Sequence, residues 1–290
     1  MCRTISIAVL CRDEETHEHI KKQFDNCGIS KEKQRIKINS AGKTSIPDFY
    51  NSVLSTSNTD IIVFVHDDVE FITKNWSEII ADSFTRNKEC NIIGLAGTSN
   101  YPNAPIGWSD SVAKEDLKYN LIQAKSPKDT GHLVYQNTSQ PLNQAVILDG
   151  FFFAIRRDAF QNFRWSNRIG RFHGYDYDVC LYQECRAPGH IFISGEIRVK
   201  HNSNGTAAGA WGAAVISIWS KYTLARNYYS PQNKPPKPDH FGVTNAKYLN
   251  IPKRSAFAAL LKGCLLNVLK GRMSPKNCFI ILRRGWINFS

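Results

Sequence analysis

The chain has 290 residues, of which 42% are hydrophobic and 21% are charged, which suffices for one large domain or one domain with an appendage. No stretch approaches about 18 consecutive apolar residues, and the apolar start soon meets charged residues, so we expect neither a membrane span nor a signal peptide. The eight cysteines are scattered without a Cys-x-x-Cys pair. This argues against a disulfide framework or a zinc site and predicts a cytoplasmic protein.

The net charge of +12 resides in the C-terminal third of the chain. Residues 1–196 carry 22 Lys and Arg against 24 Asp and Glu, a net of −2, whereas residues 197–290 carry 15 against one, a net of +14. A basic segment of this kind is expected to meet an anionic partner, such as lipid headgroups, nucleic acid or a phosphorylated substrate.

The first half of the chain alternates strand-like and helix-like segments. Short apolar runs rich in β-branched residues predict strands, and the amphipathic stretches between them predict helices. This order predicts an α/β fold with a doubly wound, mostly parallel central sheet and helices on both faces. The expected strands are 5–10, 34–38, 61–65 and 92–96, and the expected helices are 14–25, 47–54 and 76–84.

The second half is less regular. Residues 98–144 are rich in Pro, Asn, Ser and Lys, so we expect long loops with at most a short strand at 133–135, of the kind that often form substrate lids. Apolar runs at 145–148 and 151–157, separated by Asp149-Gly150, predict a strand, a bend and a second strand. Further expected elements are helices at 176–186 and 213–226 and strands at 191–193 and 197–199.

A proline-rich stretch separates the basic end from the rest of the chain. Residues 230–238 include four prolines, which predicts a linker. Beyond it, the pattern of 256–270 indicates a basic amphipathic helix, which either contacts an anionic membrane surface through 254–286 or packs on the main domain. We favour the membrane contact. The predicted organisation is a main domain at 1–229, a linker at 230–240 and a C-terminal helical extension at 241–290.

Polar residues follow the cleanest predicted strand, 61–65, in the order His66, Asp67 and Asp68. Ligand sites of α/β sheets lie at the carboxyl ends of strands, and two adjacent carboxylates repel each other there. A divalent cation that prefers oxygen ligands, Mn²⁺ or Mg²⁺, would remove this repulsion and leave room for substrate phosphates. The alternative is that the two carboxylates cap a following helix.

Three further polar motifs follow in chain order, namely Asp149-Gly150, the segment 172–181 and the segment 199–205. With the His66-Asp67-Asp68 cluster, this order resembles the GT-A type nucleotide-sugar glycosyltransferases, in their family 2-like branch, over residues 4–225. The resemblance implies that Asp68 ligates a metal bridging the donor diphosphate and that Asp67 holds the donor's ribose or sugar. His66 stands in the place of the family's first carboxylate and is a candidate for the same site.

Residues 174–181 resemble the family pattern Gly-Glu-Asp-x-Asp-x-x-Leu, with Tyr175 in place of the Glu. The resemblance implies that Asp176 is the general base that takes the proton of the acceptor hydroxyl, and one displacement by one base inverts the sugar. Both carboxylates could instead stabilise a helix N-terminus, and Asp178 is the better candidate for that role.

The remaining candidates each have a structural alternative. The resemblance implies that His201 is a further metal ligand, although it could be a surface histidine, and that Asp149 and Gly150 line the donor and acceptor cleft, although they could form a plain turn. The resemblance places Asn51 near the donor, although it could be an ordinary exposed amide. Arg156 could neutralise the donor diphosphate, or it could belong to a solvated face.

These features predict an inverting, metal-dependent glycosyltransferase that moves a hexosyl or N-acetylhexosaminyl group from a nucleotide sugar to a saccharide or lipid-linked saccharide. We expect a role in bacterial surface polysaccharide synthesis, at the inner face of the cell membrane. The acidic, glycine-free segment 11–15 argues against a sugar nucleotidyltransferase. Because positions 66 and 175 differ from the family pattern, a non-catalytic nucleotide- or glycan-binding protein remains an alternative. No nucleic acid partner is expected, because the basic tail is interleaved with aliphatic side chains.

Overall fold

The computed structural model describes residues 4–100, 108–109, 114–167 and 169–203, together with positions 214, 217, 218, 221, 222 and 261. The predicted linker at 230–240 and the basic extension at 241–290, including 254–286, lie outside these residues apart from position 261. Within the described part of the chain, no helix has the length and apolar character needed to cross a bilayer.

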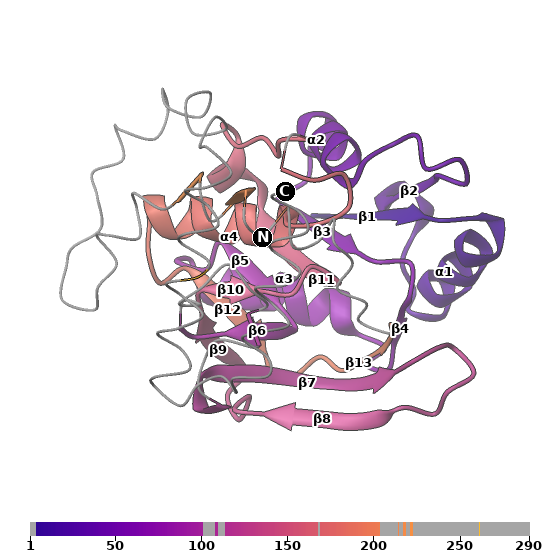
Figure 1. The fold of residues 1–290 in the computed structure, drawn as a ribbon. Helices are drawn as coiled ribbons and strands as arrows, with labels where there is room; N and C mark the ends of the chain where they lie inside the picture. Colours follow the sequence, from indigo (N-terminus) through magenta and orange to yellow (C-terminus); the bar gives the residue numbers. More distant parts are fainter. Residues whose placement is uncertain are drawn as a thin grey trace.

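A mixed seven-stranded sheet forms the centre of the molecule (Figure 1). Its strands, in spatial order, are β2 (Gln34–Ile38), β1 (Ile5–Cys11), β3 (Ile61–Val65), β11 (Phe152–Arg156), β5 (Ile92–Gly94), β12 (Ile191–Ser194) and β9 (Leu142–Ala145). Strands β2, β1, β3, β5 and β12 share one direction, whereas β11 and β9 are antiparallel to their neighbours. The expectation of a mostly parallel central sheet is confirmed.

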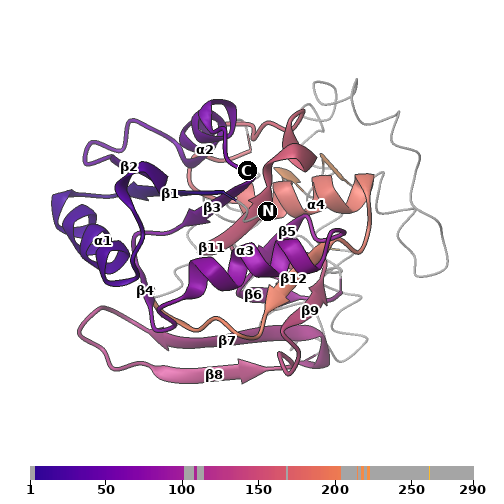
Figure 2. The same ribbon diagram turned by 180° about the vertical axis from the view of Figure 1, so that it is seen from behind.

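Helices cover both faces of this sheet. They are α1 (Glu14–Asn26), α2 (Ile46–Thr56), α3 (Trp76–Arg86) and α4 (Tyr175–Arg186). Alternate residues of β3 enter two separate buried clusters, because successive side chains of a strand point to opposite faces. One cluster includes residues of α2 and α4, and the other includes residues of α1 and α3. Helix α4 lies in front of the sheet in Figure 1, and α3 is in front in the reverse view of Figure 2.

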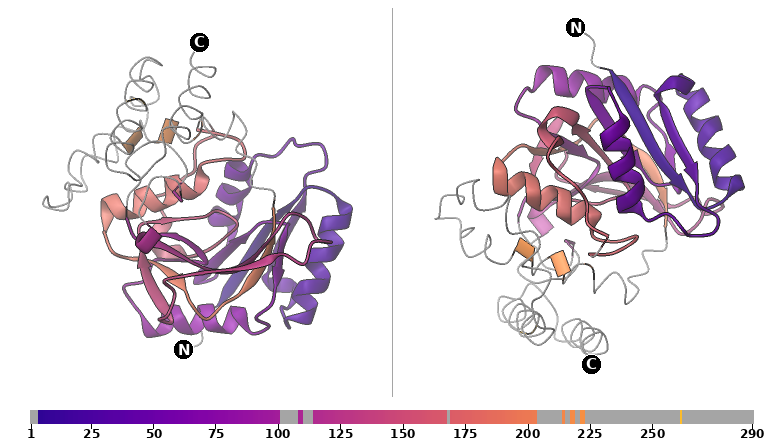
Figure 3. Two further views of the ribbon diagram at one scale, coloured as in Figure 1. Left: turned by 60° about the horizontal axis from the view of Figure 1, so that its bottom comes forward. Right: turned by 90° about the horizontal axis from the view of Figure 1, so that it is seen from above.

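A second, smaller sheet lies against one end of the first, as the left view of Figure 3 shows. Its path is β10-β6-β7-β13-β4. Strand β8 lies off this path and pairs with residues 119–123 of β7. The strands are β4 (Val69–Phe71), β6 (Ala96–Thr98), β7 (Leu117–Ala124), β8 (His132–Gln136), β10 (Ile147–Leu148) and β13 (Val199–Asn202). Strand β4 follows β3 after three residues, so the chain passes from one sheet to the other at residues 66–68.

The prediction of long loops over 98–144 is wrong for most of the described residues. Strands β7 and β8 form an antiparallel hairpin, and β9 begins at Leu142. The predicted short strand at 133–135 is β8, but β7 was missed because it buries only four of its eight residues and carries no continuous apolar run. The predicted strand at 92–96 is two strands, β5 and β6, which belong to different sheets.

Other predictions match the structure closely. The predicted strand at 151–157 is present as β11, whereas the predicted strand at 145–148 is divided between the end of β9 and β10, which belong to different sheets. The predicted strand at 197–199 begins only at Val199 as β13. In the predicted helix at 213–226, the described positions 214, 217, 218, 221 and 222 are helical.

Candidate active site

The crossover between the two sheets brings three chain segments together. The backbone N–H of His66 donates to the carbonyl of Phe151, and that of Asn202 donates to the carbonyl of Asp68, both at 2.9 Å. These bonds fix residues 66–68 between the bend before β11 and the last described strand, β13. Because β4 follows the two aspartates, they do not cap a helix, and that alternative is wrong.

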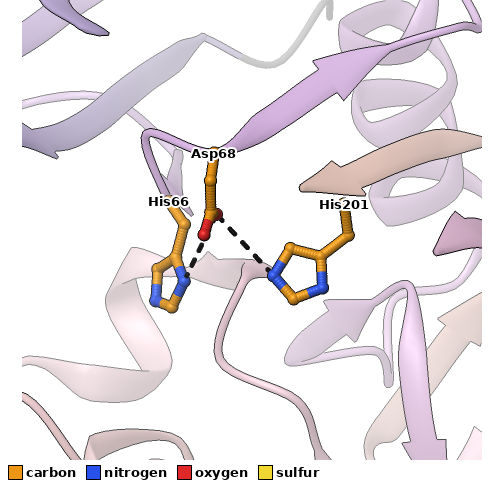
Figure 4. A group of neighbouring side chains, drawn as sticks. All are labelled: His66, Asp68 and His201. Carbon is orange, nitrogen blue, oxygen red and sulfur yellow. Dashed lines mark ion pairs between the residues drawn. The ribbon is translucent and has the colours of Figure 1, made fainter. Parts of the chain in front are cut away.

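His66, Asp68 and His201 form a compact cluster, shown in Figure 4. Asp68 Oδ1 lies 3.9 Å from His66 Nδ1 and 3.6 Å from His201 Nε2, and the ligand atoms of all three residues lie within 4.8 Å of one another. Two ligands that are each roughly 2.1 Å from one ion lie at most about 4.2 Å apart, so both of these separations suit a shared cation.

Asp68 Oδ1 provides a test of whether a cation fits this cluster. The atom is buried and has no hydrogen-bond partner, although two imidazoles face it. A buried carboxylate oxygen left without a partner is costly, and a bound cation would satisfy it. His201 is held by a stacked contact with Phe151, with ring centroids 4.6 Å apart, and burial lowers the pKa of its imidazole. The donor set therefore fits a divalent metal.

Asp67 points to a different partner, Arg12, which follows the carboxyl end of β1. The Arg12 guanidinium donates to both carboxylate oxygens, at 3.0 and 2.7 Å, and its backbone N–H donates at 2.7 Å. Burial alone would raise the pKa of Asp67, but these Arg12 interactions outweigh it and lower the pKa. Arg12 was not predicted from the sequence, although its position directly after a parallel strand was the signal that could have identified it.

Asp149, Gly150 and Asp176 lie close to one another. Asp149 accepts from the indole N–H of Trp108 at 3.3 Å and from the backbone N–H of Phe151 at 3.2 Å. Burial and the nearby charge of Asp149 raise the pKa of Asp176 to about 7, although backbone N–H groups, including that of Gly150, oppose the shift. A carboxylate poised at this pKa is suited to accept a proton near neutral pH.

The structure does not bring Arg156 to this site, which corrects the sequence-based assignment. Arg156 pairs in register with Ile61 at the start of β3, whereas the cluster follows the end of that strand. Its buried guanidinium donates to the carbonyls of Phe84, Asn87 and Cys90. Arg156 therefore stabilises the C-terminal end of α3.

Asn51 and Asp178 also make structural contacts. The Asn51 amide both donates to and accepts from the backbone of Trp165, at 2.8 and 3.0 Å, which ties α2 to the segment before α4. Asp178 is fully buried and accepts from Lys221 and from the Tyr222 hydroxyl, both at 2.7 Å. Asp178 thus anchors positions 221 and 222, which follow β13, through Oδ1, and its Oδ2 is buried without a hydrogen-bond partner among the described residues.

A cleft of about 390 Å³ opens beside the cluster, at the carboxyl ends of β1, β2 and β3. Ligands of open α/β sheets bind at this edge. The tip of β2 contributes amide and hydroxyl groups to the cleft and no carboxylate. The lining residues are Leu10, Cys11, Arg12, Asn39, Ser40, Gly42, Ile46, Tyr50, Val65, His66, Asp67, Asp68 and Phe172.

Residues 6–196 match the model of a protein family described as a glycosyltransferase-like family. The chain belongs to this family. Its membership agrees with the GT-A α/β fold expected from the sequence. The match spans the cleft, Asp67, Asp68, Asp149 and Asp176, and ends just before His201.

Two solved structures resemble this glycosyltransferase-like chain at low sequence identity. The mannosyltransferase PcManGT from Pyrobaculum calidifontis, in complex with GDP-Man and Mn²⁺, is 11% identical, with a TM-score of 0.48, over 100% of this chain and 87% of its own. GalNAc-T7 with UDP, GalNAc and Mn²⁺ is 8% identical, with a TM-score of 0.48, over 85% of this chain and 55% of its own. No curated protein matches the sequence.

Proposed function

We propose that this protein is an inverting glycosyltransferase that uses a divalent cation and a nucleotide-diphosphate sugar donor. The observation that carries the proposal is the buried, unpartnered Asp68 Oδ1 between two imidazoles, beside a cleft at the strand ends of a glycosyltransferase-family fold. The side chains of Asp68, His201 and His66 would together hold Mn²⁺ or Mg²⁺. When bound, the cation neutralises the charge that develops on the departing nucleoside diphosphate.

The chain's own carboxylates account for the remaining chemistry. Asp67, oriented by Arg12, binds the ribose or sugar hydroxyls of the donor in the cleft. Asp176 removes the proton of the acceptor hydroxyl as that oxygen bonds to the anomeric carbon and the bond from this carbon to the diphosphate oxygen breaks. The proton ends on Asp176, and the displacement inverts the anomeric centre. Asp149 and Gly150, which lie close to Asp176, would line the space between donor and acceptor.

The donor and acceptor are proposed by class. The donor carries a hexosyl or N-acetylhexosaminyl group, and the acceptor is a hydroxyl of a saccharide, either free or lipid-linked, as in surface polysaccharide synthesis. The basic residues of 254–286 would bring the enzyme to an anionic membrane surface on its cytoplasmic side.

A donor-hydrolysis screen tests this proposal. The full chain is incubated with UDP-, GDP-, dTDP- and CMP-sugars, with Mn²⁺, with Mg²⁺ and with EDTA, and released nucleotide is measured. We expect slow, EDTA-sensitive release from one donor, because water can replace the acceptor, and we expect this release to be lost in Asp68→Ala. Asp82→Asn, an exposed carboxylate on α3, is the matched control. No release from any donor, and no thermal shift with any nucleotide and Mn²⁺, would favour a non-catalytic binding protein.

A further inference from the structure

The two positions at which this chain departs from the family motif contact each other. His66 replaces the first carboxylate of the acidic motif, and Tyr175 replaces the Glu before the proposed base. In the structure, His66 Nε2 is hydrogen-bonded to the Tyr175 hydroxyl, although the two residues are 109 positions apart in the chain. The two departures therefore form one structural unit.

Tyr175 is held firmly from several sides. Its side chain is buried, and its ring packs edge-on against Tyr50, with centroids 5.5 Å apart. Gly150 leaves room for the hydroxyl, because a Cβ at that position would lie 2.5 Å from the Tyr175 oxygen. Gly174, at φ +79°, begins α4 in a left-handed conformation that few other residues adopt. The first residue of the helix is thereby placed beside the cluster.

The contacts of the Tyr175 hydroxyl suit one tautomer of His66. The hydroxyl has a single proton, and the carbonyl of Gly150 lies 3.4 Å away as its acceptor. With that proton directed at the carbonyl, the hydroxyl oxygen accepts a hydrogen bond from the N–H at His66 Nε2, and this is the tautomer we assign. A neutral imidazole that is protonated at Nε2 carries a lone pair at Nδ1, and Nδ1 is the atom that faces Asp68 Oδ1. The separation of 3.9 Å is too long for a hydrogen bond and leaves space for an ion.

We propose that Tyr175 is a positioning residue that makes His66 the third protein ligand of the cation, and that this set of two imidazoles and one carboxylate favours Mn²⁺ over Mg²⁺. The inference rests on the proposed function, since the cation is the one that would bind the donor diphosphate. Nitrogen ligands favour first-row transition ions, whereas Mg²⁺ prefers oxygen ligands and retains its water. An outer residue that orients a ligating histidine typically contributes 10- to 100-fold to metal affinity.

The test measures metal binding directly, by calorimetric titration of the full chain with Mn²⁺ alone and with Mg²⁺ alone. We expect Tyr175→Phe to weaken Mn²⁺ binding about tenfold while changing Mg²⁺ binding much less. His66→Ala should weaken Mn²⁺ binding at least as much, and the double variant should bind no more weakly than His66→Ala, because the hydroxyl acts only through the imidazole. Tyr182→Phe, on the same helix but packed on Phe160 and Phe163, should bind as the wild type does.

Two further measurements apply even if Tyr175→Phe does not fold. Nitrogen-15 NMR of the metal-free wild type should show His66 protonated at Nε2. His66→Asp, which supplies an oxygen ligand, should reduce the preference for Mn²⁺ over Mg²⁺. Unchanged Mn²⁺ affinity in Tyr175→Phe, multiplicative losses in the double variant, a proton at Nδ1, or no Mn²⁺ binding by the wild type would each overturn the inference. Mn²⁺ binding that follows these expectations without turnover of any donor would overturn only the proposed function.

Discussion

Asp176 gives the enzyme a titratable group near neutral pH. Burial and the charge of Asp149 raise its pKa to about 7, so the carboxylate is mostly protonated at pH 6. A base must be ionised to accept a proton, so transfer to the acceptor should fall about tenfold per pH unit below this pKa and level off above it. The pH profile of kcat/KM measures this. A profile that stays flat from pH 5 to 8 would show that Asp176 is not the base.

The same pKa has an opposite consequence for stability. At pH values between the ordinary pKa of an aspartate and about 7, Asp176 keeps its proton in the folded chain and loses it in the unfolded chain. The contribution of this group to the free energy of unfolding therefore decreases as pH rises through that window. Asp176→Asn, which removes the ionisation, should be more stable than the wild type at pH 8 and lose this difference near pH 4, as urea unfolding would reveal.

Arg12 is a second residue whose role can be measured. Its fork-like guanidinium holds both oxygens of Asp67, which the proposal places against the donor. We expect Arg12→Ala and Arg12→Lys both to raise the donor KM, by roughly tenfold, because an ammonium group does not reproduce the two-point contact. Arg86→Ala, which disrupts an exposed pair with Glu196, is the control. If the donor KM is unchanged in both Arg12 variants, Asp67 does not bind the donor.

At the scale of elements, the bend between β10 and β11 depends on Gly150. A Cβ there would lie 2.5 Å from the Tyr175 hydroxyl, so Gly150→Ala should displace Tyr175 and weaken Mn²⁺ binding about tenfold. Gly28→Ala is the matched control for stability, because Gly28 has φ +66° with nothing near its added Cβ. It should cost about 1 kcal/mol of stability and leave Mn²⁺ binding unchanged. Equal Mn²⁺ affinities of the Gly150 variant and the wild type would show that the bend tolerates a side chain.

Arg156 links β11 to the end of α3. Its buried guanidinium satisfies three backbone carbonyls, so Arg156→Met should destabilise the fold by about 2–3 kcal/mol, because those carbonyls lose their partners. The donor KM should not change, since Arg156 pairs with Ile61 at the other end of β3. Urea unfolding and donor kinetics on one preparation separate the two effects. A rise in donor KM without loss of stability would show that Arg156 acts at the donor site.

Strand β3, which has a continuous apolar run, was predicted from the sequence, whereas β7, which has a mixed pattern, was not. Strand β3 is buried on both faces, so its five apolar residues define it unambiguously. Strand β7 exists because it pairs with β6, β8 and β13, and such distant pairing leaves little trace in the local sequence. Arg156 was misassigned because a strand has two ends and the sequence does not show which end faces the site.

The candidate site was only partly visible in the sequence for a related reason. The position of Asp68 after a strand made it a candidate, because residues there converge on one edge of the sheet, whereas the resemblance to the GT-A family indicated His201 and Asp176. The contact of His66 with Tyr175 joins chain segments that are 109 residues apart, and no local pattern indicates it. Viewed separately, the two positions were departures from the motif.

For the whole molecule, a cation would join the two sheets, because Asp68 lies between β3 and β4 and His201 lies on β13. A ligand that binds only the folded chain stabilises it, by about 2.7 kcal/mol at a concentration of 100 Kd. We therefore expect Mn²⁺ to raise the Tm of the wild type by several degrees. Asp68→Ala should show no such shift, and Asp82→Asn should shift as the wild type does. A shift that persists in Asp68→Ala would place the ion elsewhere.

The position of His201 also bears on the order of assembly. Strand β13 is the last strand in the described part of the chain, and it inserts between β7 and β4. A growing chain carries Asp68 long before His201 is synthesised, so the cation cluster closes only when the final strand enters the small sheet. Capture of the proposed cation would thus be a late event in biogenesis, and a nascent chain that stalls before β13 would lack one of its ligands.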